Sequence, residues 1–133
     1  ARAYAQNHGL KVEVIENLKE VGFGEWEGKS SREILADNPD LIKNFYHDPI
    51  AHKPAGAEEL EQFQQRVEAA IKYTLEQYAG KKVLLVAHAG VIRAAITATI
   101  QAPAASMYRM SIDNAAIIRI KDDGIRPATI MLY

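Results

Sequence analysis

One stretch constrains the fold more than any other. Residues 83–93 read Val-Leu-Leu-Val-Ala-His-Ala-Gly-Val-Ile-Arg. The first five are apolar and mostly branched, a run too short for a typical helix and typical of a strand buried on both faces. The run ends at His88 and passes through Gly90 into a helical pattern over Val91–Ile100. We therefore predict a buried strand that turns directly into a helix.

This turn is also the strongest candidate for a functional site. Open α/β sheets bind ligands at the carboxyl ends of their strands, and His88 occupies such an end. The backbone N–H groups of Ala89 to Val91 would lie at a helix N-terminus, which attracts anions. A histidine beside such a turn predicts proton transfer or anion binding. The alternative is a structural histidine at a turn that binds nothing.

The remaining patterns predict helices and short strands around this centre. Ser30 and Glu33 match a capping box, and Leu60, Phe63 and Val67 begin an apolar stripe that should pack on the sheet. The expected helices are Ala1–His8, about 31–37, Asp40–Tyr46, Glu58 to about Ala79 and Val91–Ile100, with one more turn at Ala104–Tyr108. The expected strands are Lys11–Ile15, Val83–Ala87, Met110–Lys121 and Ile125–Leu132, the last two joined by the turn signal Asp122-Asp123-Gly124.

This order of elements predicts an α/β fold of three layers, α/β/α. Its sheet should be mostly parallel with an antiparallel edge formed by the terminal hairpin. We expect a single domain over residues 1–133, with a small helical cap at about 29–57.

Composition excludes several classes of protein. The 16 basic and 17 acidic residues give a net charge of −1, which argues against nucleic-acid binding and against an anionic-membrane anchor. The absence of cysteine excludes disulfides and thiolate metal sites. The four histidines lack paired metal-ligand spacing, so we expect no metal and no cofactor. We expect a cytoplasmic location.

A second candidate lies in the loop Leu18–Gly28. Its three glycines exclude a regular helix or strand. Phe23 and Trp26 are nevertheless too apolar for a loop that is fully exposed to solvent. A folded-back loop held by these rings could direct Glu20 into a cleft. The alternative is a solvated carboxylate on a surface turn.

These segments resemble the histidine phosphatase superfamily, the phosphoglycerate-mutase-like fold. Leu18-x-Glu20-x-x-Phe23-Gly24-x-Trp26-Glu27-Gly28 is similar to its LxExxFGxWEG segment. Pro54–Leu60 with Arg66–Val67 resembles PxGGES-L…RV, Val83–Arg93 resembles the strand before HGxxxR, and Asp113–Ala116 resembles xNAS. The matches occur in family order over essentially the whole chain. Ala57 and Ala89 stand where the family mostly has Gly.

The resemblance implies roles for individual residues. His88 matches the histidine that binds the transferring phosphoryl group, and Glu20 matches the acid that protonates the leaving alcohol and then activates water. Backbone N–H groups of Ala89 and Gly90 would hold phosphate oxygens. Arg93 lies more than a turn into the helix, where we expect a structural role. The substrate-pocket candidates are Trp26, Phe45, Tyr46 and Asn114.

The resemblance implies hydrolysis of small phosphorylated substrates through a phosphohistidine. The family's RHG motif, which carries the nucleophilic histidine on the first strand, has no match here, so we expect an N-terminally incomplete domain that lacks its first strand and is inactive alone. We also expect a homodimer or a strand-borrowing partner. The short cap resembles α-ribazole-5′-phosphate phosphatases and general acid phosphatases. A phosphoglycerate-type mutase and a non-catalytic pseudophosphatase or scaffold are the alternatives.

Overall fold

The body of the molecule is built on its longest helix. In the computed structural model, which describes residues 1–133, α4 (Leu60–Gln77) packs against α5 (Ala89–Thr99) and the short 3₁₀ helix η3 (Ala104–Arg109). Nine buried side chains form the core between these elements and the nearby loop: Val21, Leu60, Phe63, Val67, Val91, Ala94, Ala95, Ala104 and Met107. The predicted stripe of α4 is confirmed, but it packs on α5 and η3 rather than on a sheet.

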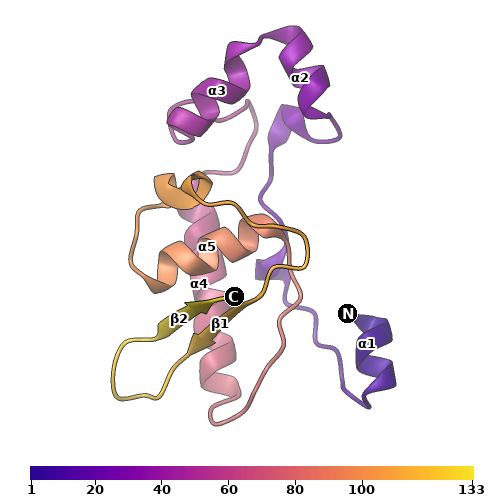
Figure 1. Cartoon of the computed structure of the whole chain (residues 1–133), viewed down its shortest axis with the longest axis vertical. Coiled ribbons are helices and arrows are strands. Elements are labelled where there is room, and N and C mark those ends of the chain that lie inside the picture. Colours follow the sequence, from indigo (N-terminus) through magenta and orange to yellow (C-terminus); the bar gives the residue numbers. More distant parts are fainter.

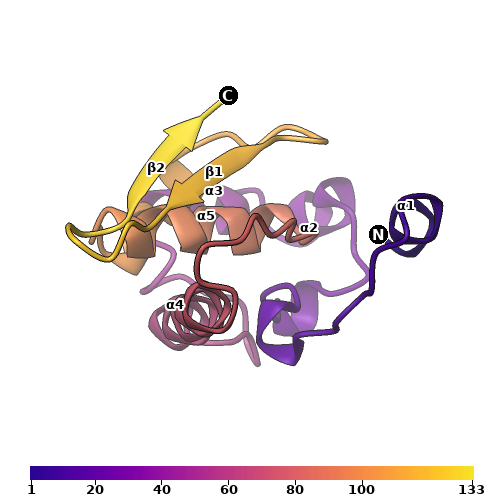
Figure 2. The ribbon, with the colours of Figure 1, turned by 90° about the horizontal axis from the view of Figure 1, so that it is seen from below.

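A terminal hairpin covers the other side of α5. Strands β1 (Ile118–Lys121) and β2 (Thr129–Leu132) are antiparallel, with Ile118 opposite Leu132. Viewed from below, α5 lies between this hairpin and α4 (Figure 2). The hairpin is confirmed, but β1 is shorter than the predicted Met110–Lys121. A turn at Asn114–Ala115, where Ala115 adopts a positive φ of 60°, keeps the preceding residues out of the strand.

The mostly parallel sheet predicted from the sequence is not formed. The only sheet is the two-stranded hairpin. Residues 83–87 and 11–15 belong to no strand, and the backbone of residues 83–87 makes no hydrogen bond to other backbone groups. A strand exists only as part of a hydrogen-bonded pair, and no neighbouring segment pairs with these residues.

Two short helices form the cap at one end of the molecule. These are α2 (Ser31–Asp37) and α3 (Asp40–His47), drawn at the top of Figure 1. The capping box is confirmed, because Ser30 N–H donates to Glu33 at 2.6 Å and Glu33 N–H donates to Ser30 Oγ at 3.3 Å. Phe45, only 4% exposed, attaches the cap to the body through an edge-to-face contact with Tyr108, with ring centroids 4.7 Å apart.

The chain enters and leaves the cap at one narrow point, which we call the neck: Gly24 on one segment and Ala55–Ala57 on the other. Glu25 N–H donates to Ala55 O at 3.0 Å. Gly24, in the 3₁₀ helix η2 (Gly24–Trp26), has φ +55°, and a Cβ there would overlap the backbone of Ala55–Ala57. Only glycine allows this approach.

Two further helical elements complete the chain: α1 (Arg2–Asn7) and the 3₁₀ helix η1 (Glu16–Leu18). Helix α1 ends one residue before the predicted limit, and Gly9 follows it with φ +62°, which suits a residue beyond a helix C-terminus. None of the helices combines the length and apolarity needed to cross a bilayer.

Candidate active site

The predicted turn at residues 88–90 forms the centre of the site. His88 precedes α5 with extended backbone, and its carbonyl accepts a hydrogen bond from Ile92 N–H at 3.0 Å. The His88 side chain is exposed and makes no hydrogen bond to the protein. Both imidazole nitrogens are therefore free to bind a ligand at the start of the helix.

Glu20 reaches this turn from a segment seventy residues earlier in the chain. Its Oε2 accepts a hydrogen bond from Gly90 N–H at 3.2 Å, and its Oε1 accepts one from Val21 N–H at 3.0 Å. The half-buried carboxylate thus lies at the positive end of the α5 dipole, where negative charge is stabilised. The structure places Glu20 beside Gly90, two residues after His88, and the catalytic roles of Glu20 and His88 stay predictions.

Gly90 leaves room for the Glu20 carboxylate at this point, and a larger residue would displace that side chain. Its φ is not positive, but a Cβ at this position would overlap Glu20 Oε1. The Gly90 N–H is already bonded to Glu20, whereas Ala89 N–H donates to no backbone or side-chain acceptor. Phosphate binding by these two N–H groups stays a prediction. For Gly90 it would require the Glu20 carboxylate to release the donor.

Arg66, on α4, fixes the loop that carries Glu20. Its Nη1 donates to Asn17 O at 2.7 Å and to Lys19 O at 2.8 Å, and its Nη2 donates to Glu20 O at 3.1 Å. The guanidinium also lies over the ring of Phe63, 4.5 Å from its centroid. One side chain, whose guanidinium rests on the core residue Phe63, thereby holds three backbone carbonyls of this loop.

Glu58 completes this clamp from the other side. Its carboxylate accepts Arg66 Nε at 2.7 Å and Arg66 Nη2 at 3.0 Å, and it accepts Gly22 N–H at 3.2 Å. The hydrogen bonds from Arg66 hold the pKa of Glu58 below its ordinary value, against a smaller opposing effect of burial. The Glu20 loop is therefore tied to the body by a bidentate ion pair, the strong form of this interaction.

The four predicted pocket residues occupy different surroundings. Phe45 is buried, with Trp26 5.3 Å away and Tyr46 5.8 Å away between ring centroids, so it supports the cap from within. Trp26 borders a separate small cavity of about 60 Å³. Tyr46 lines a larger pocket of about 500 Å³ with Arg93 and Tyr108. Asn114 is exposed and lies beside the Asp113 end of that pocket.

Sequence reasoning gave no role to Arg66, Glu58 or Tyr108. Arg66 and Glu58 belong to a matched motif, but their eight-residue separation gave no sign that they pair with each other and with the Glu20 loop. Tyr108 falls in a short turn with no pattern of its own. No three His, Cys, Asp or Glu side chains lie close enough together to hold a metal ion.

A carboxylate and an imidazole at a helix N-terminus are the groups expected in an acid–base and anion-binding site. Comparison with known proteins agrees with this class. The sequence profile of the "Histidine phosphatase superfamily (branch 1)" matches residues 1–132. The chain therefore belongs to the histidine phosphatase superfamily.

Three relatives are 28–31% identical to the chain over the residues that align. The adenosylcobalamin/alpha-ribazole phosphatase of Escherichia coli K12 is 29% identical over 85% of this chain and 56% of its own length. An acid phosphatase of Mycobacterium tuberculosis H37Rv is 31% identical over 82% of this chain and 51% of its own length. The alpha-ribazole phosphatase structure from Shigella flexneri is 28% identical with a TM-score of 0.77, covering 98% of this chain and 64% of that one. The chain thus spans little more than half the length of these curated relatives.

Proposed function

We propose that this protein hydrolyses phosphomonoesters, with Glu20 as general acid and base and His88 as a ligand of the transferring phosphoryl group. The observation that carries the proposal is the hydrogen bond from Gly90 N–H to Glu20 Oε2 at 3.2 Å, which places a carboxylate beside the helix N-terminus next to His88. Membership in the superfamily and the phosphatase names of the relatives support it.

In the proposed reaction, the imidazolium form of His88 and the N–H groups at the start of α5 stabilise negative charge on the phosphoryl oxygens. Glu20 donates a proton to the leaving alcohol and then takes one from the attacking water. We propose a phosphohistidine intermediate. His88 binds the phosphoryl group in this proposal, and we assign the nucleophilic role to none of the three remaining histidines in residues 1–133. His8 stacks on Tyr4 in α1, and His47 and His52 lie in the cap region.

We also propose a three-layer α/β/α arrangement in which residues 83–87 pair in a mostly parallel sheet. The continuous apolar run and the unpaired backbone of these residues support this proposal. The fold likeness to the Bacillus stearothermophilus YhfR structure, at 24% identity and a TM-score of 0.81, agrees with it.

The test is hydrolysis of p-nitrophenyl phosphate by the protein isolated from its source, with and without EDTA. We expect metal-independent release of inorganic phosphate, and a fall of about 10²- to 10⁴-fold in kcat for Glu20→Gln and about 10²- to 10³-fold for His88→Ala. The matched controls are Glu25→Gln in the same loop and His52→Ala in the cap, both exposed and expected to retain activity.

Other outcomes would point elsewhere. Phosphate transfer that requires a bisphosphate primer would favour the mutase, and a correctly folded protein that hydrolyses no ester would favour the scaffold. The names of the relatives make α-ribazole 5′-phosphate a first natural substrate to test.

A further inference from the structure

The segment that carries Glu20 has no regular structure of its own. Residues 19–23 belong to no helix and no strand, and the N–H groups of Glu20 and Val21 donate to no backbone carbonyl. A segment without helix or strand hydrogen bonds opens easily unless other groups hold it. The position of the Glu20 carboxylate therefore depends on contacts from outside the segment.

Arg66 supplies these contacts on the amino side of Glu20. Its Nη1 donates to the carbonyls of Asn17 at 2.7 Å and Lys19 at 2.8 Å. Its Nη2 donates to the carbonyl of Glu20 itself at 3.1 Å. A guanidinium is a rigid planar fork, so it fixes the three carbonyl oxygens relative to one another as well as to α4.

Glu58 supplies the contacts on the carboxyl side of Glu20. Its carboxylate accepts a hydrogen bond from Gly22 N–H at 3.2 Å, and its own N–H donates to Gly22 O at 2.8 Å. Val21, which lies between the two fixed positions, is 5% exposed and belongs to the core. The backbone is thus fixed on both sides of Glu20, and only the torsions of its side chain remain free.

Two hydrogen bonds limit this remaining freedom. Glu20 Oε1 accepts Val21 N–H at 3.0 Å, and Glu20 Oε2 accepts Gly90 N–H at 3.2 Å. Gly90 belongs to α5, whereas Arg66 belongs to α4, and these two helices pack against each other. The clamp on the backbone and the packing of the helices together determine where the carboxylate lies relative to His88.

We propose that Arg66 and Glu58 are positioning residues, which hold Glu20 where it can transfer a proton to the leaving alcohol. The inference rests on the proposed function, because the clamp has a catalytic consequence only if Glu20 is the general acid. Displacement of a reacting group by about 1 Å can cost about 10²-fold in rate. The ion pair between Arg66 and Glu58 therefore contributes to the rate of the reaction as well as to stability.

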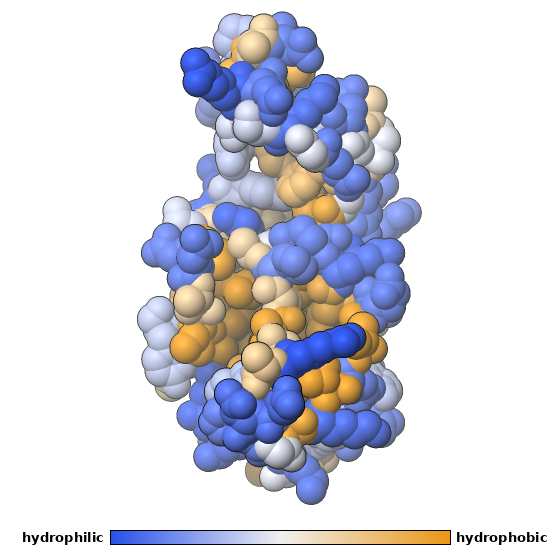
Figure 3. Space-filling view, turned by 90° about the vertical axis from the view of Figure 1, so that its right-hand side faces the viewer, coloured by the Kyte–Doolittle hydropathy of each residue, from blue (hydrophilic) through white to orange (hydrophobic).

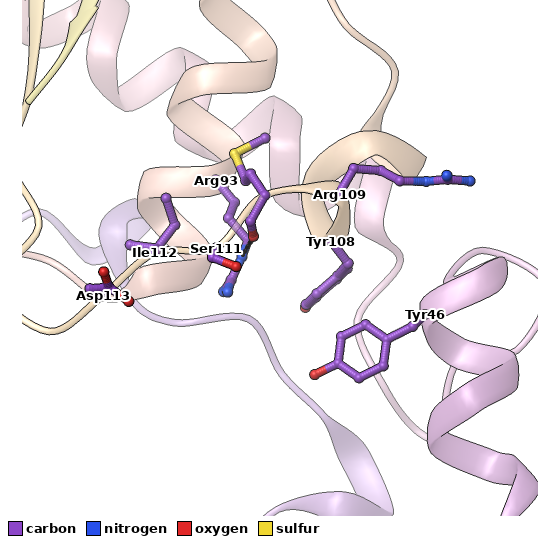
Figure 4. A pocket seen from close by; sticks show the side chains of 8 residues that line it. Tyr46, Arg93, Tyr108, Arg109, Ser111, Ile112 and Asp113 are labelled. Atoms are coloured by element: carbon purple, nitrogen blue, oxygen red, sulfur yellow. Dashed lines mark hydrogen bonds between the residues drawn. The ribbon is translucent and has the colours of Figure 1, made fainter.

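The clamp is separate from the large pocket beside the cap. That pocket has a volume of about 500 Å³, and Figure 4 shows Tyr46, Arg93 and Tyr108 at one end of it. Neither Arg66 nor Glu58 lines it. All three guanidinium nitrogens of Arg66 already donate to the protein. A change at the clamp should therefore alter proton transfer and leave phosphate binding unchanged.

The test compares phenyl phosphate with p-nitrophenyl phosphate as substrates of the protein isolated from its source. The esters differ only in a nitro group, which makes nitrophenolate the better leaving group and the less dependent on a proton. Arg66→Lys keeps the charge but loses the fork. We expect it to lower kcat/KM about 10- to 100-fold for phenyl phosphate, and about tenfold less for p-nitrophenyl phosphate. Inhibition by inorganic phosphate should stay within about twofold.

A double-mutant cycle shows whether Arg66 acts through Glu20. In Glu20→Gln the general acid is already removed, so adding Arg66→Lys should change kcat/KM for phenyl phosphate by no more than about twofold. Lys53→Gln is the matched control. It breaks the pair between Lys53 Nζ and Glu59 Oε1 at 2.5 Å, which lies next to the clamp and makes no contact with the Glu20 loop. This variant should keep the original activity on both esters.

Three results would overturn the proposal. They are equal falls for the two esters in Arg66→Lys, a full additional fall in the Glu20→Gln background, and the same leaving-group dependence in Lys53→Gln. If Arg66→Lys does not fold, Glu58→Gln takes its place in each assay. It removes the charge but keeps an oxygen that can accept Gly22 N–H, and it should give the same pattern with smaller falls.

Failure of the proposed function has a different signature. If the protein hydrolyses neither ester, the phosphatase proposal is wrong, and hydrogen exchange of the Gly90 amide then decides the positioning role. This N–H lies in the first turn of α5 and has no partner within the helix, so its protection reports the bond to Glu20. Arg66→Lys should raise its exchange rate to that of Glu20→Ala, with no change in the middle of α5. Unchanged exchange at Gly90 would overturn the clamp.

Discussion

The side chains that form the core between α4, α5 and η3 and those of the segment Val83–Val86 are all apolar, yet the first are buried and the second are exposed. Phe63 and Val67 are fully buried, whereas Leu84 and Val86 are 65% and 62% exposed. Figure 3 shows apolar surface over the lower half of one face of the molecule. A helix satisfies its own backbone and needs only one apolar contact face, but a strand needs a neighbour for its hydrogen bonds and for its faces. The comparison shows that apolar content predicts burial only when the required neighbours are present.

The largest effect should come from emptying the core. Phe63→Ala removes a ring that is 0% exposed and supports Arg66, and we expect it to lower the free energy of unfolding by about 3–5 kcal/mol. Urea denaturation measures the change, and Glu68→Ala on the exposed face of α4 is the control. If Phe63→Ala and Glu68→Ala lowered the free energy of unfolding by the same small amount, the contrast between the buried core and the exposed segment Val83–Val86 would be wrong.

Arg66→Ala should have the next largest effect. Removing one partner of a buried pair costs about 3–5 kcal/mol. We expect the lower end, because the Arg66 and Glu58 side chains are 15% and 23% exposed. Lys19→Ala is the control, since Lys19 pairs with Glu16 on the surface.

The same variant should change the dependence of stability on pH. The folded pKa of Glu58 lies below its ordinary 4.5, so the pair stabilises the protein above that pH and the stabilisation is lost as pH falls through the folded pKa. Unfolding measured across the acid range should show a steeper decline for the original protein than for Arg66→Ala. Parallel curves would show that the pair contributes nothing.

A smaller effect is expected at the cap. Ser30→Ala removes the acceptor of the Glu33 N–H bond and should destabilise α2 by about 1 kcal/mol. Hydrogen exchange of the α2 amides reports this locally. Ser30→Thr should restore protection, and Ser31→Ala, which removes no cap bond, should leave it unchanged.

The smallest effect is expected in the exposed segment. In a single chain, Leu84→Ser should change the free energy of unfolding by no more than about 0.5 kcal/mol, because the side chain is already in water. A cost that approaches that of Phe63→Ala would show that another strand covers this segment. That is the result which the predicted homodimer or strand-borrowing partner requires, and light scattering on the same sample would give the number of chains.

Local patterns predicted the helices and the turn at His88. The helix beginning at Ser31, the stripe Leu60–Phe63–Val67 and the turn at His88 depend on neighbours within a few residues, so the sequence contains the information that forms them. The sequence indicated that the loop could direct Glu20 into a cleft, but its hydrogen bond with Gly90 was not predicted.

Local sequence patterns could not predict contacts between segments that are far apart in the chain. The clamp of Arg66 on three carbonyls of the Glu20 loop joins segments nearly fifty residues apart. Neither end has a periodicity that identifies the other. The predicted parallel sheet is not formed here for a related reason, because the apolar run at 83–87 specifies a strand without specifying its partner. The long predicted strand is interrupted at Ala115, which adopts a positive φ. Alanine rarely does so, and the sequence therefore did not indicate a turn at this position.

The neck at Gly24 has a consequence for how the molecule can vary. The two ends of the segment from residue 25 to residue 55 are joined by a single hydrogen bond. The segment is therefore a cassette, by which we mean an insertion whose two attachment points stay together whatever lies between them. Lengthening, shortening or exchanging it would not stretch the body or move Glu20. Tyr46 and the pocket wall that it forms lie inside the cassette. The segment also contains Phe45, whose ring packs on Tyr108 of the body. An exchanged segment must therefore keep this contact, and position 24 must remain glycine.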